Sequence, residues 1–237
     1  YRVNDPDGSL RIRENLETIW RYQKVLELRN ESSSLKGKIG FELRKRGADG
    51  TWQAVDEDTV FSDGESIAFR VINRAGIPVH VSVLDLGLSK RIGLLHPPAS
   101  ASEMLAAGRS SGGATDVETT GVLIVGERSD DEIGLSFPEN VGFLRHRSNG
   151  NSHGHSNGDS HAELRGKEIF KLCVTTDRHD LGFLKQSGVR MDNAPTPRPG
   201  LEELIYSAMG ESTREAARKN GPYDDWVTIE RSFWLKK

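Results

Sequence analysis

The stretch Ser66–Gly87 reads SIAFRVINRAGIPVHVSVLDLG, and the spacing of its apolar side chains decides the class of fold. Apolar residues occupy every second position before the central NRAG and again after it. A period of two places these side chains on one face of a β-strand, and a glycine-containing break between two such runs is typical of a turn. The stretch therefore predicts a β-hairpin, and it contains no obvious catalytic residue.

Short strands with the same alternation are predicted on both sides of this hairpin. They cover residues 38–43, 51–55, 92–95, 122–125, 133–137, 168–175 and 225–235. Because these strands follow one another at hairpin spacing without crossover helices, an antiparallel arrangement is favoured over a parallel α/β one. We predict a mainly β protein, built as an antiparallel, Ig-like β-sandwich with peripheral helices at its N- and C-terminal ends.

The N-terminal helix is predicted over residues 10–29. Apolar side chains lie near one stripe at helical spacing there, namely Ile12, Leu16, Ile19, Trp20 and Leu26. This stripe needs a partner surface, and the following sheet is expected to supply it. Two short helices are predicted near the C-terminus. One has its apolar face at Leu201, Leu204, Ile205 and Ala208, and the next starts at a capping box formed by Ser212 and Glu215.

One domain with three parts follows from this pattern. Residues 1–35 carry the N-terminal helix, residues 36–188 form the sandwich core, and residues 189–237 contribute a linker, helices and a closing strand. Residues 99–119 are predicted to form a long connection. Residues 146–161 contain no apolar side chain, so they are expected to form a mobile insertion.

The composition excludes several classes of function. The formal charge of −3 disfavours nucleic-acid binding, which requires a clustered basic excess. No apolar run is long enough to cross a bilayer, so no membrane association is predicted. The single cysteine, Cys173, indicates a reducing, cytoplasmic compartment. A chain that begins with Tyr1 is expected to be part of a longer polypeptide.

Two residues are candidates for nucleophilic catalysis by an autonomous hydrolase. Ser110 lies in GRSSG, which matches the G-x-S-x-G pattern, but a small-residue loop replaces the strand-to-helix turn that this pattern requires. Cys173 is followed by His179, yet a cysteine in the middle of a strand is typical of a small buried hydrophobe. The sequence therefore predicts no catalytic residue, and the hydrolase remains the second alternative.

The sequence also contains candidate ligands for a metal ion. His153, His155 and His161, with His146 nearby, can bind zinc or nickel in vitro, but their glycine, serine and asparagine neighbours offer no fixed geometry. We predict no metal site and no cofactor.

Three tryptophans could instead form a sugar-stacking platform, which keeps a carbohydrate- or ligand-binding module as the first alternative. They are Trp52, Trp226 and Trp234.

Several stretches together resemble a known family. The segment from Phe61 to Pro98 contains VLDLG, and Gly166–Leu184 contains KLCVTT. These pieces, together with WRYQKVLELRN near the start and DDWVTIERSFWL at the end, are similar to a domain of unknown function. That domain is often found C-terminal to caspase-like peptidase domains of the metacaspase and orthocaspase type. The usual Gly-Asp order of its turn is replaced here by Asp63-Gly64-Glu65.

The resemblance implies an accessory role beside a cysteine peptidase. The chain lacks the cysteine signature of caspases, and its histidine and cysteine stand in the wrong local order, so no catalytic residue carries over. We therefore expect a non-catalytic interaction or regulatory module. Its expected partner is a caspase-like peptidase domain in the same polypeptide, or the substrate of that peptidase.

Overall fold

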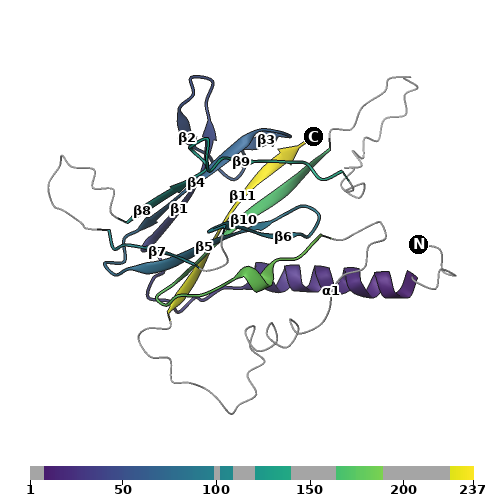
Figure 1. The fold of residues 1–237 in the computed structure, drawn as a ribbon, viewed down its shortest axis with the longest axis horizontal. Helices are drawn as coiled ribbons and strands as arrows, with labels where there is room; N and C mark the ends of the chain where they lie inside the picture. The colour runs from purple at the N-terminus through teal and green to yellow at the C-terminus, as the bar shows by residue number, and fades with distance from the viewer. Residues whose placement is uncertain (1–7, 99–101, 109–120, 140–163, 189–224) are drawn as a thin grey trace, which may run out of the picture.

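The computed structural model describes residues 8–98, 102–108, 121–139, 164–188 and 225–237. In these ranges the protein is mainly β, with one long helix, α1 (Gly8–Glu27), and two sheets (Figure 1). The mainly β prediction is therefore confirmed. A short 3-10 turn, η2 (Gly182–Leu184), follows β10 (Arg165–Thr175) in the chain.

The first sheet, sheet A, has the order β2-β1-β4-β8, with β9 also paired to β4. Its strands are β1 (Ile39–Arg46), β2 (Trp52–Ala54), β4 (Ser66–Asn73), β8 (Val122–Val125) and β9 (Ile133–Gly134). All of its pairings in the described residues are antiparallel.

The second sheet, sheet B, has the order β3-β11-β10-β5-β6, with β7 also paired to β5. Its strands are β3 (Val60–Ser62), β5 (Val79–Leu86), β6 (Ile92–His96), β7 (Glu103–Leu105), β10 (Arg165–Thr175) and β11 (Trp226–Lys236). The pairing of β3 with β11 is parallel, so the sheet is not antiparallel throughout.

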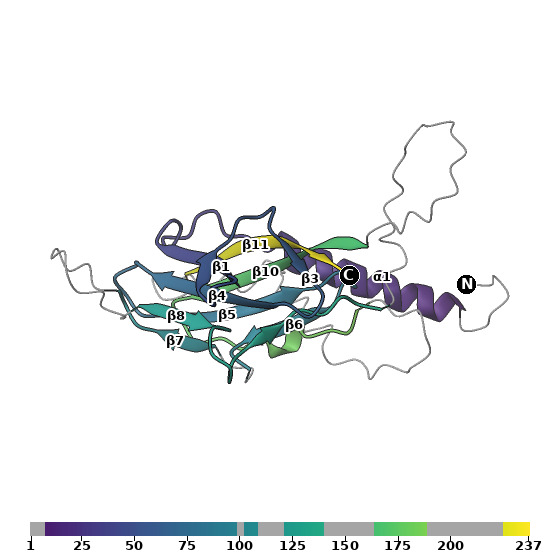
Figure 2. The ribbon, with the colours of Figure 1, turned by 90° about the horizontal axis from the view of Figure 1, so that it is seen from above.

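One hydrophobic core joins the two sheets. Alternate side chains of β1 and β4 meet those of β5, β10 and β11, and Figure 2 shows the strands seen from above. Phe233 packs in this core, with its ring centroid 5.2 Å from those of both Phe61 and Phe170 in edge-to-face geometry. The side chains of all three are buried. The period of two in the sequence thus builds the apolar interior between the sheets.

The predicted hairpin over Ser66–Gly87 is wrong. Its two strands exist as β4 and β5, but β4 pairs in sheet A and β5 in sheet B, so the chain crosses from one sheet to the other. The side-chain amide nitrogen of Asn73 donates to the carbonyls of Ile77 and Ala106, and its side-chain oxygen accepts from the backbone amide of Ala75. These bonds hold the crossing that the sequence suggested was a hairpin turn.

The position of the N-terminal helix is confirmed, but its predicted packing face is wrong. Tyr22 and Val25 are the side chains that α1 buries against sheet B, with Leu26 partly buried beside them. Ile12 and Leu16 are 47% and 60% exposed, and Ile19 and Trp20 are exposed as well. Among the described residues, the contact of the helix with the apolar cluster on the outer face of sheet B comes from its C-terminal half.

Other predictions differ in detail. Within the stretch 99–119, predicted as a connection, residues 103–105 form β7. The short strand β3 was not predicted, because three residues are too few to show a period. The insertion 146–161, the linker 189–200 and the C-terminal helices lie outside the described residues. No helix in the described ranges is long and apolar enough to cross a membrane.

Candidate functional site

The C-terminal end of α1 is fastened to β10 and β11 by side chains rather than by backbone pairing. The ammonium group of Lys171 donates to the carbonyl of Leu26 at 2.8 Å, and the hydroxyl of Thr228 donates to the carbonyl of Leu28 at 2.7 Å. These carbonyls come from the last turn of the helix and the residue after it, where backbone acceptors lack a helical partner. A cation at this position also suits the negative end of the helix dipole.

Lys171 is the most unusual residue of this contact, because its side chain is completely buried. It lies directly opposite Glu230 on the neighbouring strand, and its ammonium nitrogen is 2.8 Å from a carboxylate oxygen of Glu230. Arg29 approaches the other carboxylate oxygen at 3.5 Å. A buried charge needs a paired and hydrogen-bonded partner, and these contacts supply it.

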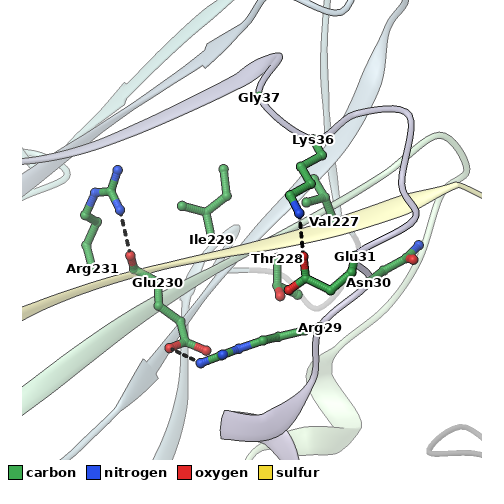
Figure 3. Close-up of a pocket in the computed structure, with 10 residues that line it drawn as sticks. All are labelled: Arg29, Asn30, Glu31, Lys36, Gly37, Val227, Thr228, Ile229, Glu230 and Arg231. Carbon is green, nitrogen blue, oxygen red and sulfur yellow. Dashed lines mark hydrogen bonds and ion pairs between the residues drawn. The ribbon is translucent and has the colours of Figure 1, made fainter.

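A cavity with a volume of about 340 Å³ opens beside this network. Its walls come from the loop after α1 and from the middle of β11, as Figure 3 shows. We call it the seam cavity. Its lining residues are Arg29, Asn30, Glu31, Lys36, Gly37, Val227, Thr228, Ile229, Glu230 and Arg231. The volume lies within the range of ligand pockets.

Both signs of charge line the seam cavity. Lys36 pairs with Glu31 at 2.5 Å, and Arg29 pairs with Glu230. Arg231 donates through its Nε atom to the carbonyl of Phe41 in sheet A and so links the edges of the two sheets. Three cationic and two anionic side chains therefore border the cavity, and the excess is positive.

The loop after α1 is held in place at both of its ends. The side-chain amide of Asn30 donates to the carbonyl of Trp226 at 2.9 Å, and the backbone amide of Ser34 donates to the carboxylate of Asp225 at 2.7 Å. Leu35 inserts its side chain into the core between the sheets. Gly37 has a φ of +76°, a conformation that favours glycine, and it turns the loop into β1.

The structure buries Cys173, one of the two candidate nucleophiles. Its side chain lies on the outer face of sheet B, in the apolar cluster that contains Tyr22 and Val25 of α1. Burial, the largest effect, raises the pKa of the thiol to about 12, with a smaller increase from Glu230 and an opposing effect of Lys171. His179 is paired elsewhere, with Thr175 at 2.8 Å and with Ser102 through its backbone.

A second group of buried charges lies on β5 and β10, beside the core residues Phe170 and Phe233. Glu168 and Asp85 are nearly inaccessible to water, and Arg91 pairs with Asp85 at 2.6 Å. Burial and the neighbouring Asp85 carboxylate raise the pKa of Glu168 to about 8. Burial also raises the pKa of Asp85, although Arg91 opposes the change. This pair can store a proton near neutral pH.

The tryptophan candidates, which the structure describes, do not converge on one site. Trp52 lies in β2 of sheet A, whereas Trp226 and Trp234 lie at opposite ends of β11, about 26 Å apart along the strand. The two tryptophans of β11 are thus too far apart to stack on one sugar ring. Ser110, His146, His153, His155 and His161 lie outside the described residues. In the described part of the chain, no cluster of three or more potential ligands is arranged to hold a metal ion.

The sequence did not predict the ion-pair network of Lys171, Glu230 and Arg29. A signal was present in EIFKLCVT, where Lys171 lies between Ile169 and Cys173 on the second face of the strand. A charge in such a position indicates a buried partner, but sequence does not identify that partner. The opposing Glu230 comes from a strand 59 residues away along the chain.

Searches of protein-family models and of curated proteins found no match to this chain. The resemblance to the caspase-associated domain therefore remains a prediction, and the geometry of the seam cavity is the main guide to function.

Proposed function

We propose that this chain is a non-catalytic protein-interaction module with an Ig-like sandwich architecture, an accessory domain of a caspase-like cysteine peptidase in a reducing, cytoplasmic compartment. The observation that carries the proposal is the seam cavity. Its walls are a strand fixed in a sheet and a loop tied down at both ends, so the cavity exists before any partner arrives. A preformed cavity loses less conformational entropy on binding.

Two further features support binding rather than chemistry. The thiol of Cys173 is buried and its raised pKa keeps it protonated near neutral pH, whereas a nucleophilic cysteine needs an exposed thiolate. Four charged groups of the seam cavity are held in ion pairs, Arg29 with Glu230 and Lys36 with Glu31, which suits recognition of a polar partner.

The proposal is tested by mixing the purified chain with the catalytic domain of a caspase-like peptidase. We expect a complex in titration calorimetry and a change in the turnover of a peptide substrate. Arg29→Ala combined with Lys36→Ala should weaken the complex about tenfold, since two interfacial cations are lost.

The matched control is Arg46→Ala, which removes an exposed cation at the far end of β1 and should leave affinity unchanged. Absence of a complex, together with unchanged turnover, would contradict the proposed partner. Equal weakening by the seam variant and by the control would instead remove the seam cavity from the interface.

A further inference from the structure

The two edges of β11 differ in how many of their backbone groups form hydrogen bonds with a neighbouring strand. On one side β11 pairs with β10 along its whole length, from Trp226 to Lys236. On the other side β3 covers only Trp234–Lys236. There the amide of Trp234 donates to Thr59, and the carbonyl of Lys236 accepts from Asp63. Even-numbered residues of β11 therefore direct their backbone groups toward this outer edge.

Between Trp226 and Ser232, only some of the backbone groups on the outer edge have hydrogen-bond partners among the described residues. The carbonyl of Trp226 accepts from Asn30, and the carbonyl of Glu230 accepts from the side chain of Arg231. The outward amides of Thr228, Glu230 and Ser232 receive no hydrogen-bond partner from the described residues, and neither do the carbonyls of Thr228 and Ser232. Strand edges with free donors and acceptors pair readily with another extended chain.

The free part of the edge borders the seam cavity. Thr228 and Glu230 belong both to this edge and to the cavity lining, and Figure 3 shows them on the strand that crosses the cavity. Gly37 is also part of the lining, and it offers no side chain to fill the space. Five residues from Thr228 to Ser232 correspond to about 17 Å of strand, enough for a short extended segment.

We propose that the outer edge of β11 from Thr228 to Ser232 binds an extended segment of a partner protein as an added strand. This inference rests on the proposed function as an interaction module and names the kind of segment that the module recognises. Backbone pairing supplies part of the affinity in this mode of binding, and side-chain pockets supply the specificity. Because the cavity lining has one more cationic than anionic side chain, the segment carries an acidic side chain.

The direct test selects binders from a phage-displayed library of random linear peptides with the purified chain as bait. We expect selected peptides with an aspartate or glutamate and a run of β-forming residues. Affinity is then measured by calorimetry for the chain and for Ser232→Pro, which removes one outward amide without touching the pairing with β10. We expect Ser232→Pro to weaken binding about tenfold, whereas the matched Ser232→Ala leaves affinity unchanged.

A second measurement leaves the protein unaltered. Single N-methyl groups are placed along a selected peptide, each removing one backbone donor. Strand addition predicts a period of two, with about tenfold weakening at alternate positions and little change between them.

The outcomes separate this inference from the proposed function. A peptide that binds the seam cavity but tolerates both Ser232→Pro and every N-methyl group would overturn strand addition and leave the interaction module intact. A selection that yields no binding peptide would also overturn strand addition, whatever the result with the peptidase domain.

Discussion

The two faces of sheet B bury different kinds of side chain. The inner face, which meets sheet A, is mainly apolar, but it also buries Asp85 and Glu168, which lie opposite Phe170 and Phe233 on the neighbouring strands. The outer face, beneath α1, buries Lys171 in the middle of the sheet, next to Cys173. The inner face determines the fold, whereas the outer face fixes the helix and the loop that form the seam cavity.

The largest expected effect concerns the inner face. Phe233→Ala removes the ring that two others contact edge to face, and it should lower the free energy of unfolding by about 3–5 kcal/mol. Chemical denaturation measures this difference. The neighbouring Ser232→Ala serves as the control, since Ser232 is only partly buried and its change should stay within about 0.5 kcal/mol. Similar values for both variants would contradict the location of the core.

The next effect concerns the outer face. Lys171→Met keeps an unbranched chain but removes the donor to Leu26 and Glu230, and it should lower the free energy of unfolding by about 2 kcal/mol. Lys167→Met is the control, because Lys167 is exposed on the same strand and face. If Lys171→Met were as stable as the parent chain, the hydrogen bonds of Lys171 would not be what fastens the helix to the outer face.

The buried carboxyl pair of the inner face, Asp85 and Glu168, predicts a dependence of stability on pH. The pKa of Glu168 is raised from 4.5 to about 8, so the folded chain keeps a proton that the unfolded chain releases. Stability should therefore fall as pH rises from about 4.5 to 8, by at most about 1.4 kcal/mol per pH unit from this group. Denaturation midpoints across this window should show a shallower fall for Glu168→Gln. Identical pH profiles of the variant and the parent chain would contradict the raised pKa.

The smallest expected effect concerns Cys173. Cys173→Ala should cost about 1 kcal/mol, because it deletes one sulfur atom from a packed cluster. In the parent chain a thiol reagent should label Cys173 at least about a hundredfold more slowly in the folded than in the unfolded state. Lys167→Cys in a Cys173→Ala background provides an exposed thiol for comparison. Equal labelling rates for Cys173 and the exposed thiol would revive the hydrolase hypothesis.

The sequence predicted the strands better than it predicted their partners. The alternation in Ser66–Gly87 correctly indicates two strands, because each has one face in the core between the sheets. It does not indicate that they belong to different sheets, since a hairpin and a crossing between sheets both require an inward apolar face. The deciding contacts of Asn73 reach the carbonyl of Ala106, which is 33 residues away.

The site was less accessible to sequence reasoning than the strands. The apolar stripe of the N-terminal helix led to Ile12 and Leu16, whereas packing depends on Tyr22 and Val25 near the end of the helix. Tyr22 does not belong to that stripe. Its hydroxyl donates a hydrogen bond to the carbonyl of Leu86, and because the polar group is satisfied, the ring can be buried. The seam cavity combines residues 29–37 with residues 227–231, and no local pattern connects two segments so far apart.

The central claim is that the outward backbone amides of β11 between Trp226 and Phe233, which have no partner among the described residues, are free to pair, and amide hydrogen exchange followed by NMR tests it most directly. The account predicts alternating protection in the free chain. The amides of Ile229 and Arg231, paired with β10, should exchange slowly, and those of Thr228, Glu230 and Ser232 should exchange fast. Uniformly slow exchange of all five amides would contradict the account, because it would mean that another segment already occupies the edge.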